Sequence, residues 1–366
     1  MTGGDPIAER LRELQTASLA RSKSLCERLL SYPRALAVAQ HTLVGGTPCD
    51  VLYQKGTHRL LRYRRDPPAT WAEPVLLCYA LINRPYILDL QPDKSVVQQY
   101  LTRGFDVYII DWGVPGHTDR FLTLENYVCG FLHEAVEVIL RERARDSLHL
   151  LGYCMGGTMS ALYAALHPKV IKTLTLLAAP IDFGGRESLL NVWADGAYFD
   201  VDAFIDAQGN CPAWFLQACF QNLKPIQNGL QKNLSMFENI EDLRFLSNYF
   251  AMELWVNDNI PVAGETFREF VKEFYQRNRL VLGEFYLGGR RVDLGSITCS
   301  LLLLTAKNDH LVPPSSTVAI GRHVKSKDVA SREIDAGHVG LVVSGKAQRG
   351  LWPEATRWLA DRSTPV

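Results

Sequence analysis

The sequence predicts an α/β fold in which helices cover both faces of a mostly parallel sheet. Short apolar segments rich in β-branched residues alternate with segments of helical periodicity, which is typical of parallel sheets. No glycine-rich phosphate-binding turn opens any of these helices, which argues against dinucleotide-binding and P-loop folds. Strands are expected at about 50–54, 59–63, 75–80, 106–110, 148–151, 172–178 and 298–305, and helices at about 94–102, 124–143 and 157–167.

The alternation stops between residues 181 and 296, where the sequence becomes aromatic and helical in character. We expect an N-terminal helical region at 1–49, a catalytic core at 50–180 and 297–366, and an inserted cap at 181–296. An insertion between two core strands would lie over the carboxyl edge of the sheet, where ligands bind in open α/β folds. Most of its aromatic side chains are also expected to fill the core of the cap itself.

The segment from Ile7 to Leu30 has apolar residues at helical spacing between charged ones, which predicts an amphipathic helix. Two interpretations remain open. The helix packs on its own domain, or its apolar face docks a partner.

The composition and the sequence patterns limit the classes of function that this protein can have. The 39 Lys and Arg residues balance 39 Asp and Glu residues, so nucleic acid is not an expected partner. The longest apolar run, Val75 to Ile82, is eight residues, well short of the ~20 that span a bilayer. The N-terminus lacks the features of a secretory signal, so a cytoplasmic protein is expected. None of the eight cysteines has a zinc-ligand spacing, so no metal site is expected.

One cysteine lies in a distinctive turn. The apolar strand expected at 148–151 runs into Gly152-Tyr153-Cys154-Met155-Gly156, and a helix follows. This is the layout of a nucleophile elbow, where glycines are needed because the strand and the helix approach closely on either side of the nucleophile. The turn specifies the α/β-hydrolase fold, with Cys154 as nucleophile.

In that fold the acid and then the histidine follow the nucleophile along the chain. Asp309 follows the strand expected at 298–305, and His338 follows a further short strand. Taken singly, Asp309 is compatible with a turn and His338 with a surface position, but their joint order predicts the triad Cys154, Asp309 and His338. His310 is a secondary candidate. Asp111 precedes the nucleophile, the wrong order for the acid, and is interpreted as shaping a glycine-rich loop.

The oxyanion of the reaction is expected to bind two main-chain N–H groups. One belongs to Met155, the residue after the nucleophile. The other comes from the loop after the strand at 75–80, with Ile82 and Asn83 as candidates, because the His-Gly signature of many esterases is missing there.

A cysteine nucleophile favours acyl transfer over ester hydrolysis. A thiolate that attacks an acyl thioester forms another thioester, so the acyl group stays activated on the enzyme for transfer to an acceptor. A serine ester would lose that activation.

These features resemble the catalytic subunit of polyhydroxyalkanoate synthases, most closely the class III type, with class IV as the less similar alternative. The resemblance covers roughly 50–360 and is carried by the Cys154 turn, Asp309-His310, Gly337-His338 and three longer segments. These segments are Ala80 to Pro92, Asp106 to Gly113 and Trp255 to Pro261.

The resemblance implies polymerisation of (R)-3-hydroxyacyl-CoA, such as 3-hydroxybutyryl-CoA, with release of CoA and without a cofactor. It also implies a homodimer, a second non-catalytic subunit and attachment to cytoplasmic polyester granules. A cysteine-dependent thioesterase or hydrolase would share the fold and triad. An inactive relative acting as a scaffold is a further alternative, which the intact triad opposes.

Overall fold

The computed structural model describes residues 16, 23, 27–28, 30–223 and 231–366. The helix expected over 7–30 therefore lies almost wholly outside the described residues. Contacts divide the chain into two units, one of Met1–Leu43 with Lys224–Leu254 and one of Val44–Leu223 with Trp255–Val366.

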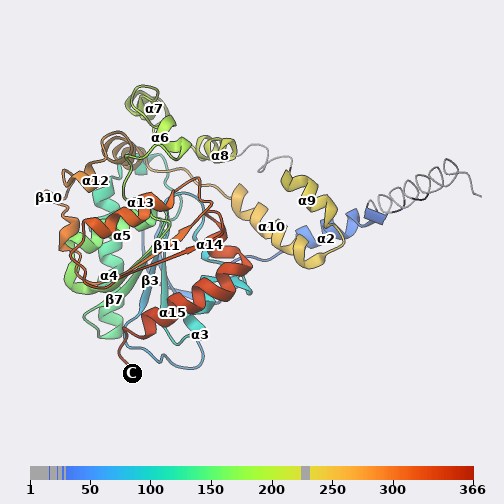
Figure 1. Ribbon diagram of the computed structural model, residues 1–366, viewed down its shortest axis with the longest axis horizontal. Coiled ribbons are helices and arrows are strands. Elements are labelled where there is room, and N and C mark those ends of the chain that lie inside the picture. The colour runs from blue at the N-terminus through green and yellow to red at the C-terminus, as the bar shows by residue number, and fades with distance from the viewer. Residues whose placement is uncertain (1–15, 17–22, 24–26, 29, 224–230) are drawn as a thin grey trace, which may run out of the picture. The chain divides into compact units, whose positions relative to one another are not determined.

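The larger unit is built on an eight-stranded sheet in the order β1-β2-β6-β3-β7-β8-β11-β12 (Figure 1). The first two pairings, β1 with β2 and β2 with β6, are antiparallel, and the other five are parallel. The strands are β1 (Cys49–Lys55), β2 (His58–Tyr63), β3 (Val75–Cys78), β6 (Val107–Asp111), β7 (Leu148–Tyr153), β8 (Ile171–Leu177), β11 (Ser300–Ala306) and β12 (Val329–Ile334). The predicted mostly parallel sheet is confirmed.

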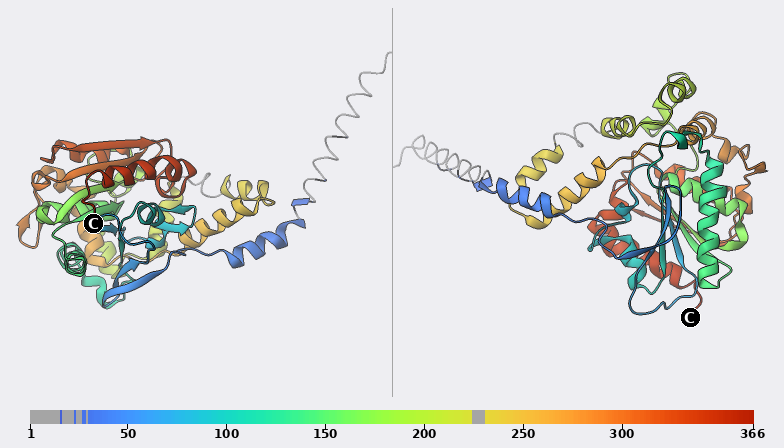
Figure 2. Two further views of the ribbon diagram at one scale, coloured as in Figure 1. Left: turned by 90° about the horizontal axis from the view of Figure 1, so that it is seen from below. Right: turned by 180° about the vertical axis from the view of Figure 1, so that it is seen from behind.

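The central strands are buried along their whole length because helices cover both faces of the sheet. Every residue of β3 and β7 is buried. Figures 1 and 2 show α4 (His133–Arg143) and α5 (Met155–Leu166) on one face, and α3 (Val96–Thr102) and α15 (Trp352–Ala360) on the other. The helix expected at 124–143 begins as the π-helix η3 (Asn126–Leu132), which continues into α4.

Short helices follow β8 in the segment expected to form a cap. In the larger unit these are α6 (Leu189–Trp193), α7 (Val201–Gln208), α8 (Ala213–Asn222), α11 (Gly264–Glu269), the π-helix η6 (Phe270–Gln276) and α12 (Arg279–Leu282). Two short strands, β9 (Tyr286–Leu287) and β10 (Arg290–Arg291), follow them and pair with each other.

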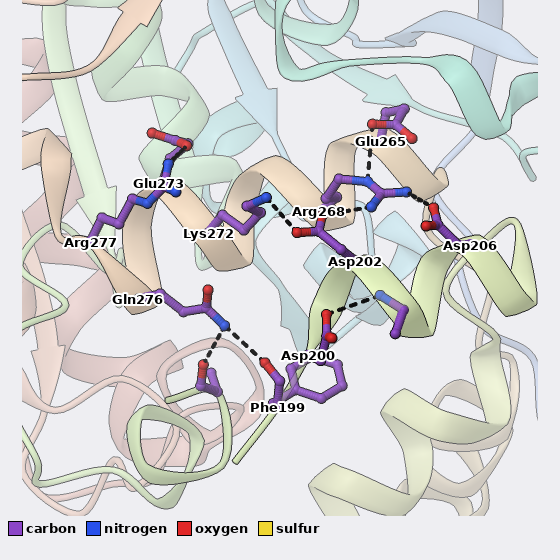
Figure 3. A network of polar contacts seen from close by, with 12 residues as sticks. Phe199, Asp200, Asp202, Asp206, Glu265, Arg268, Lys272, Glu273, Gln276 and Arg277 are labelled. Carbon is purple, nitrogen blue, oxygen red and sulfur yellow. Dashed lines mark hydrogen bonds and ion pairs between the residues drawn. The ribbon is translucent and has the colours of Figure 1, made fainter. Parts of the chain in front are cut away.

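Ion pairs hold α7 against α11 and η6, as Figure 3 shows. Arg268 Nη1 lies 2.6 Å from Asp202 Oδ1, and its Nη2 lies 2.6 Å from Asp206 Oδ1. Lys272 Nζ lies 2.6 Å from the other Asp202 oxygen. At the neighbouring turn, the side-chain amide of Gln276 donates to the carbonyl of Phe199 at 3.1 Å.

The smaller unit is helical and contains α2 (Tyr32–His41), α9 (Lys232–Glu238) and the greater part of α10 (Leu243–Asn257). Its core joins Ala35 of α2 to Ile240 and Leu246, all nearly inaccessible to solvent. The described residues 231–254, expected to belong to one cap with the rest of 181–296, thus fall in one contact unit with the N-terminal segment and pack on α2. The three-part division at 49, 180 and 296 stays a prediction.

Within the described ranges, no helix combines the length and apolar character needed to cross a bilayer. In the same ranges, no three His, Cys, Asp or Glu side chains come together in a group that could hold a metal ion.

Candidate active site

Cys154 lies in a strained turn between the last residue of β7 and the first residue of α5. Its φ is +55° and its ψ is −129°, a backbone conformation that L-residues rarely adopt. The turn is tight enough that a Cβ on Gly156 would lie 2.3 Å from the Cys78 carbonyl oxygen, and one on Gly157 would lie 2.3 Å from the Ala179 Cβ. The glycine spacing in the sequence therefore has the steric cause expected of a nucleophile elbow.

Asp309 and His338 come together from the loops after β11 and β12. His338 Nδ1 lies 2.7 Å from Asp309 Oδ2. The other Asp309 oxygen accepts hydrogen bonds from the main-chain N–H groups of Leu311 at 2.9 Å and Val312 at 2.8 Å. Because Asp309 accepts a hydrogen bond from the Nδ1–H group of His338, the other ring nitrogen of His338 is left for Cys154.

Electrostatics favours the charged form of His338. Burial by itself would lower the pKa of His338, but the neighbouring Asp309 and Cys154, through charge and hydrogen bonding, raise that pKa to about 10. The imidazolium form of His338 is therefore favoured at neutral pH. Cys154 also lies at the N-terminal end of α5, where the helix dipole favours a negative charge.

Burial disfavours the thiolate form of the other described cysteines. Burial is the main cause that raises the pKa of each one, to about 12 at Cys78 and to about 11 at Cys299. Burial also raises the pKa of Cys49, Cys129, Cys211 and Cys219.

Two of the three oxyanion candidates lie at the same cavity as Cys154. Met155 is the first residue of α5, and N–H groups at a helix start have no partner within the helix. Ile82 lines the cavity with Met155, whereas Asn83, with a φ of +65°, is not among the lining residues. Which of these main-chain N–H groups bind the oxyanion stays a prediction.

Neither of the remaining sequence candidates, His310 and Asp111, lines the cavity at Cys154. His310 is exposed, and its main-chain carbonyl accepts a hydrogen bond from the Ser188 hydroxyl at 3.0 Å. Asp111 forms an ion pair with Arg59 and accepts the N–H of Gly113 at 3.0 Å, so it holds the glycine-rich loop as expected.

Cys154 opens onto an apolar cavity whose empty space, counted together with the part open to solvent, is about 940 Å³. Its walls come from the turn at Cys154, from the segment between β8 and β11, and from Ile82, Leu311 and Val312. The aromatic lining residues are Trp193, Phe199, Phe215, Phe220, Phe267, Phe270 and Tyr275. The sequence indicated an aromatic cap but not which of its side chains face Cys154. Tyr275, on the π-helix η6, was not anticipated as a residue of the site.

The fold and the turn define an α/β-hydrolase-fold protein with a cysteine in the nucleophile position. The sequence matches the family described as "alpha/beta hydrolase fold" over residues 73–344. Residues 2–101 match the family described as "Poly-beta-hydroxybutyrate polymerase (PhaC) N-terminus".

Similar proteins named "Poly(3-hydroxyalkanoate) polymerase subunit PhaC" span most of the chain. The Synechocystis protein is 42% identical over 324 residues, covering 87% of this chain and 86% of its own. The Haloferax mediterranei protein is 40% identical, covering 96% and 71%, and the Allochromatium vinosum protein is 38% identical, covering 93% and 98%. The chain belongs to the PhaC family of poly(3-hydroxyalkanoate) polymerase subunits, and the resemblance in the sequence is confirmed.

Proposed function

We propose that this protein polymerises (R)-3-hydroxyacyl-CoA into polyester and that Cys154 carries the growing acyl chain as a thioester. One observation supports this most directly. Cys154 lies in a nucleophile elbow at the wall of an apolar cavity, and the nearby His338 is hydrogen-bonded to Asp309.

In the first step the Cys154 thiolate attacks the carbonyl carbon of the acyl-CoA thioester. The negative charge develops on the carbonyl oxygen, for which the N–H groups of Met155 and Ile82 are the proposed donors. The carbon–sulfur bond to CoA then breaks, and the CoA thiolate leaves with the proton that His338 holds. The acyl group remains activated on Cys154.

In the second step a hydroxyl group attacks the acyl-Cys154 carbonyl. His338, now neutral, takes the hydroxyl proton as the new ester bond forms, and Cys154 leaves as a thiolate. Each cycle adds one ester bond and releases one CoA. Water in place of the hydroxyl would give hydrolysis, so an apolar cavity favours polymerisation.

Family membership further supports 3-hydroxybutyryl-CoA as a substrate, a homodimer, a second non-catalytic subunit and attachment to polyester granules in the cytoplasm. The cyanobacterial and Allochromatium relatives point to the class III type.

The proposal is tested by incubating the purified protein with (R)-3-hydroxybutyryl-CoA, with and without the candidate second subunit. We expect CoA release together with insoluble polymer, and loss of both in Cys154→Ala. Cys129→Ala, which alters a half-buried thiol outside the cavity, is the matched control and should keep both. Free hydroxyacid without polymer would identify a hydrolase instead. CoA release retained in Cys154→Ala would exclude the assigned nucleophile.

A further inference from the structure

Tyr153, the residue before the nucleophile, contacts His338 in two ways. Its ring is stacked on the imidazole, with ring centroids 5.1 Å apart and an angle of 22° between the planes. Its hydroxyl donates a hydrogen bond to the main-chain carbonyl of His338 at 3.4 Å. Tyr153 is 1% exposed, so water does not compete with either contact.

We propose that Tyr153 is a positioning residue whose ring face fixes the His338 imidazole opposite Cys154 and stabilises its protonated form. The inference rests on the proposed function, because the roles of Cys154 and His338 come from there. It adds a residue that acts through His338 rather than on the substrate.

Tyr153 and Asp309 contact different parts of the imidazole. Asp309 binds one edge of the ring, at Nδ1, whereas Tyr153 lies against its face. A ring stacked on the face of the imidazole restricts its rotation. The Tyr153 ring also packs against the ring of Tyr79, with centroids 5.7 Å apart and an angle of 50° between the planes.

The chemistry of the contact favours a cation. The face of an aromatic ring is electron-rich, and it attracts a positive group within about 6 Å of its centroid, more strongly when water is excluded. The titratable groups around His338 are Asp309 after β11, Cys154 after β7 and Tyr153 at the end of β7. Burial raises the pKa of Tyr153 well above its usual value, with further contributions from Tyr79, Cys154 and Asp309, so its hydroxyl stays neutral.

The test compares three kinds of variant: Tyr153→Leu, Tyr153→Phe, and a series that has phenylalanines with an increasing number of ring fluorines at position 153. The readout is the pH profile of Cys154 alkylation by iodoacetamide, resolved by peptide mass spectrometry, together with thiolate absorbance. We expect Tyr153→Leu to move the midpoint of alkylation to higher pH by about one unit. Tyr153→Phe should have the same alkylation midpoint as the wild type. Each added fluorine should raise the midpoint further, because fluorine withdraws electron density from the ring face.

Tyr100→Leu is the matched control, because Tyr100 is also fully buried and packs on Phe105 and Trp352 away from the site. It should lower the melting temperature and leave the pH profile unchanged. If Tyr153→Leu does not fold, the fluorinated series, which keeps the ring shape, decides alone. An unchanged midpoint across that series would overturn the inference. Failure of the proposed function would instead appear as wild-type protein that makes no polymer, whatever its alkylation profile.

Discussion

Asp309 sets how strong a base His338 can be. Its side chain is fully buried and accepts hydrogen bonds from His338 and from the N–H groups of Leu311 and Val312. The two half-reactions need different base strengths, because a thiol gives up its proton far more readily than an alcohol. A weakened base should therefore affect chain growth more than the first acylation.

We predict that Asp309→Asn lowers single-turnover CoA release by about tenfold and polymer growth by about 10³-fold, within the range of general-base effects. Rapid-quench measurement of CoA release and of polymer length separates the two steps. His338→Gln serves as a comparison and should impair both steps strongly. Equal losses in both steps of Asp309→Asn would contradict this division of roles.

At the scale of the elements, the site depends on how closely α5 approaches β7 and the loop after β8. A side chain at residue 157 would clash with Ala179, because a Cβ on Gly157 would lie 2.3 Å from the Ala179 Cβ. A strand and a helix that meet this closely fix the main-chain position of Cys154.

We predict that Gly157→Ala destabilises the protein by about 1–3 kcal/mol through overpacking and reduces acylation of Cys154. The second substitution Ala179→Gly removes the atom at 2.3 Å, leaving the Gly152 carbonyl oxygen at 3.0 Å. The double variant should therefore recover part of the lost stability in a denaturant titration. A double variant no more stable than Gly157→Ala would show that the Ala179 contact is not the cause.

The helices around the cavity are joined by ion pairs on the outside of the cap segment. Hydrogen bonds from Lys272 and Arg268 hold the pKa of Asp202 below its usual range. A carboxyl whose pKa is lower in the folded state stabilises the fold at neutral pH, and that contribution is lost as the pH falls through the folded-state pKa.

We predict that Asp202→Asn increases hydrogen exchange in α7 by roughly two- to fivefold, as expected for a partly exposed pair worth up to about 1 kcal/mol. Acidification of the wild type to well below its usual carboxyl pKa should have the same effect. Asp50→Asn, which removes an exposed pair with Arg64 on the β1–β2 hairpin, is the control and should leave α7 unchanged. Unaltered exchange in α7 of Asp202→Asn would refute the role of the pair.

At the scale of the whole molecule, the candidate active site lies in one of the two contact units. The residues around Cys154 and its cavity all belong to the larger unit. The smaller unit is held by its own small core of Ala35, Ile240 and Leu246. Loss of that core should leave acylation chemistry intact.

We predict that Leu246→Ala costs the smaller unit about 2–5 kcal/mol and increases hydrogen exchange in α2 and α10. Single-turnover CoA release should stay close to that of the wild type. Leu243→Ala, on the same helix but 38% exposed, is the control and should change exchange little. Loss of CoA release in Leu246→Ala would show that acylation requires the smaller unit.

The sequence by itself determined the features that depend on spacing along the chain. The strands and helices of the core follow from local periodicity, and Gly152, Cys154 and Gly156 specify their turn because the strain is local. The order of Cys154, Asp309 and His338 could be found for a similar reason, since each follows a recognisable strand.

Only the tertiary structure decided which distant side chains meet. The π-helices η3 and η6 were not foreseen, because an apolar pattern does not distinguish them from α-helix. Sequence periodicity also did not reveal Tyr275 at the cavity, the packing of Ile240 and Leu246 on Ala35, or the contact of Tyr153 with His338. Contacts of this kind depend on the path of the chain between the residues, and spacing in the sequence does not record that path.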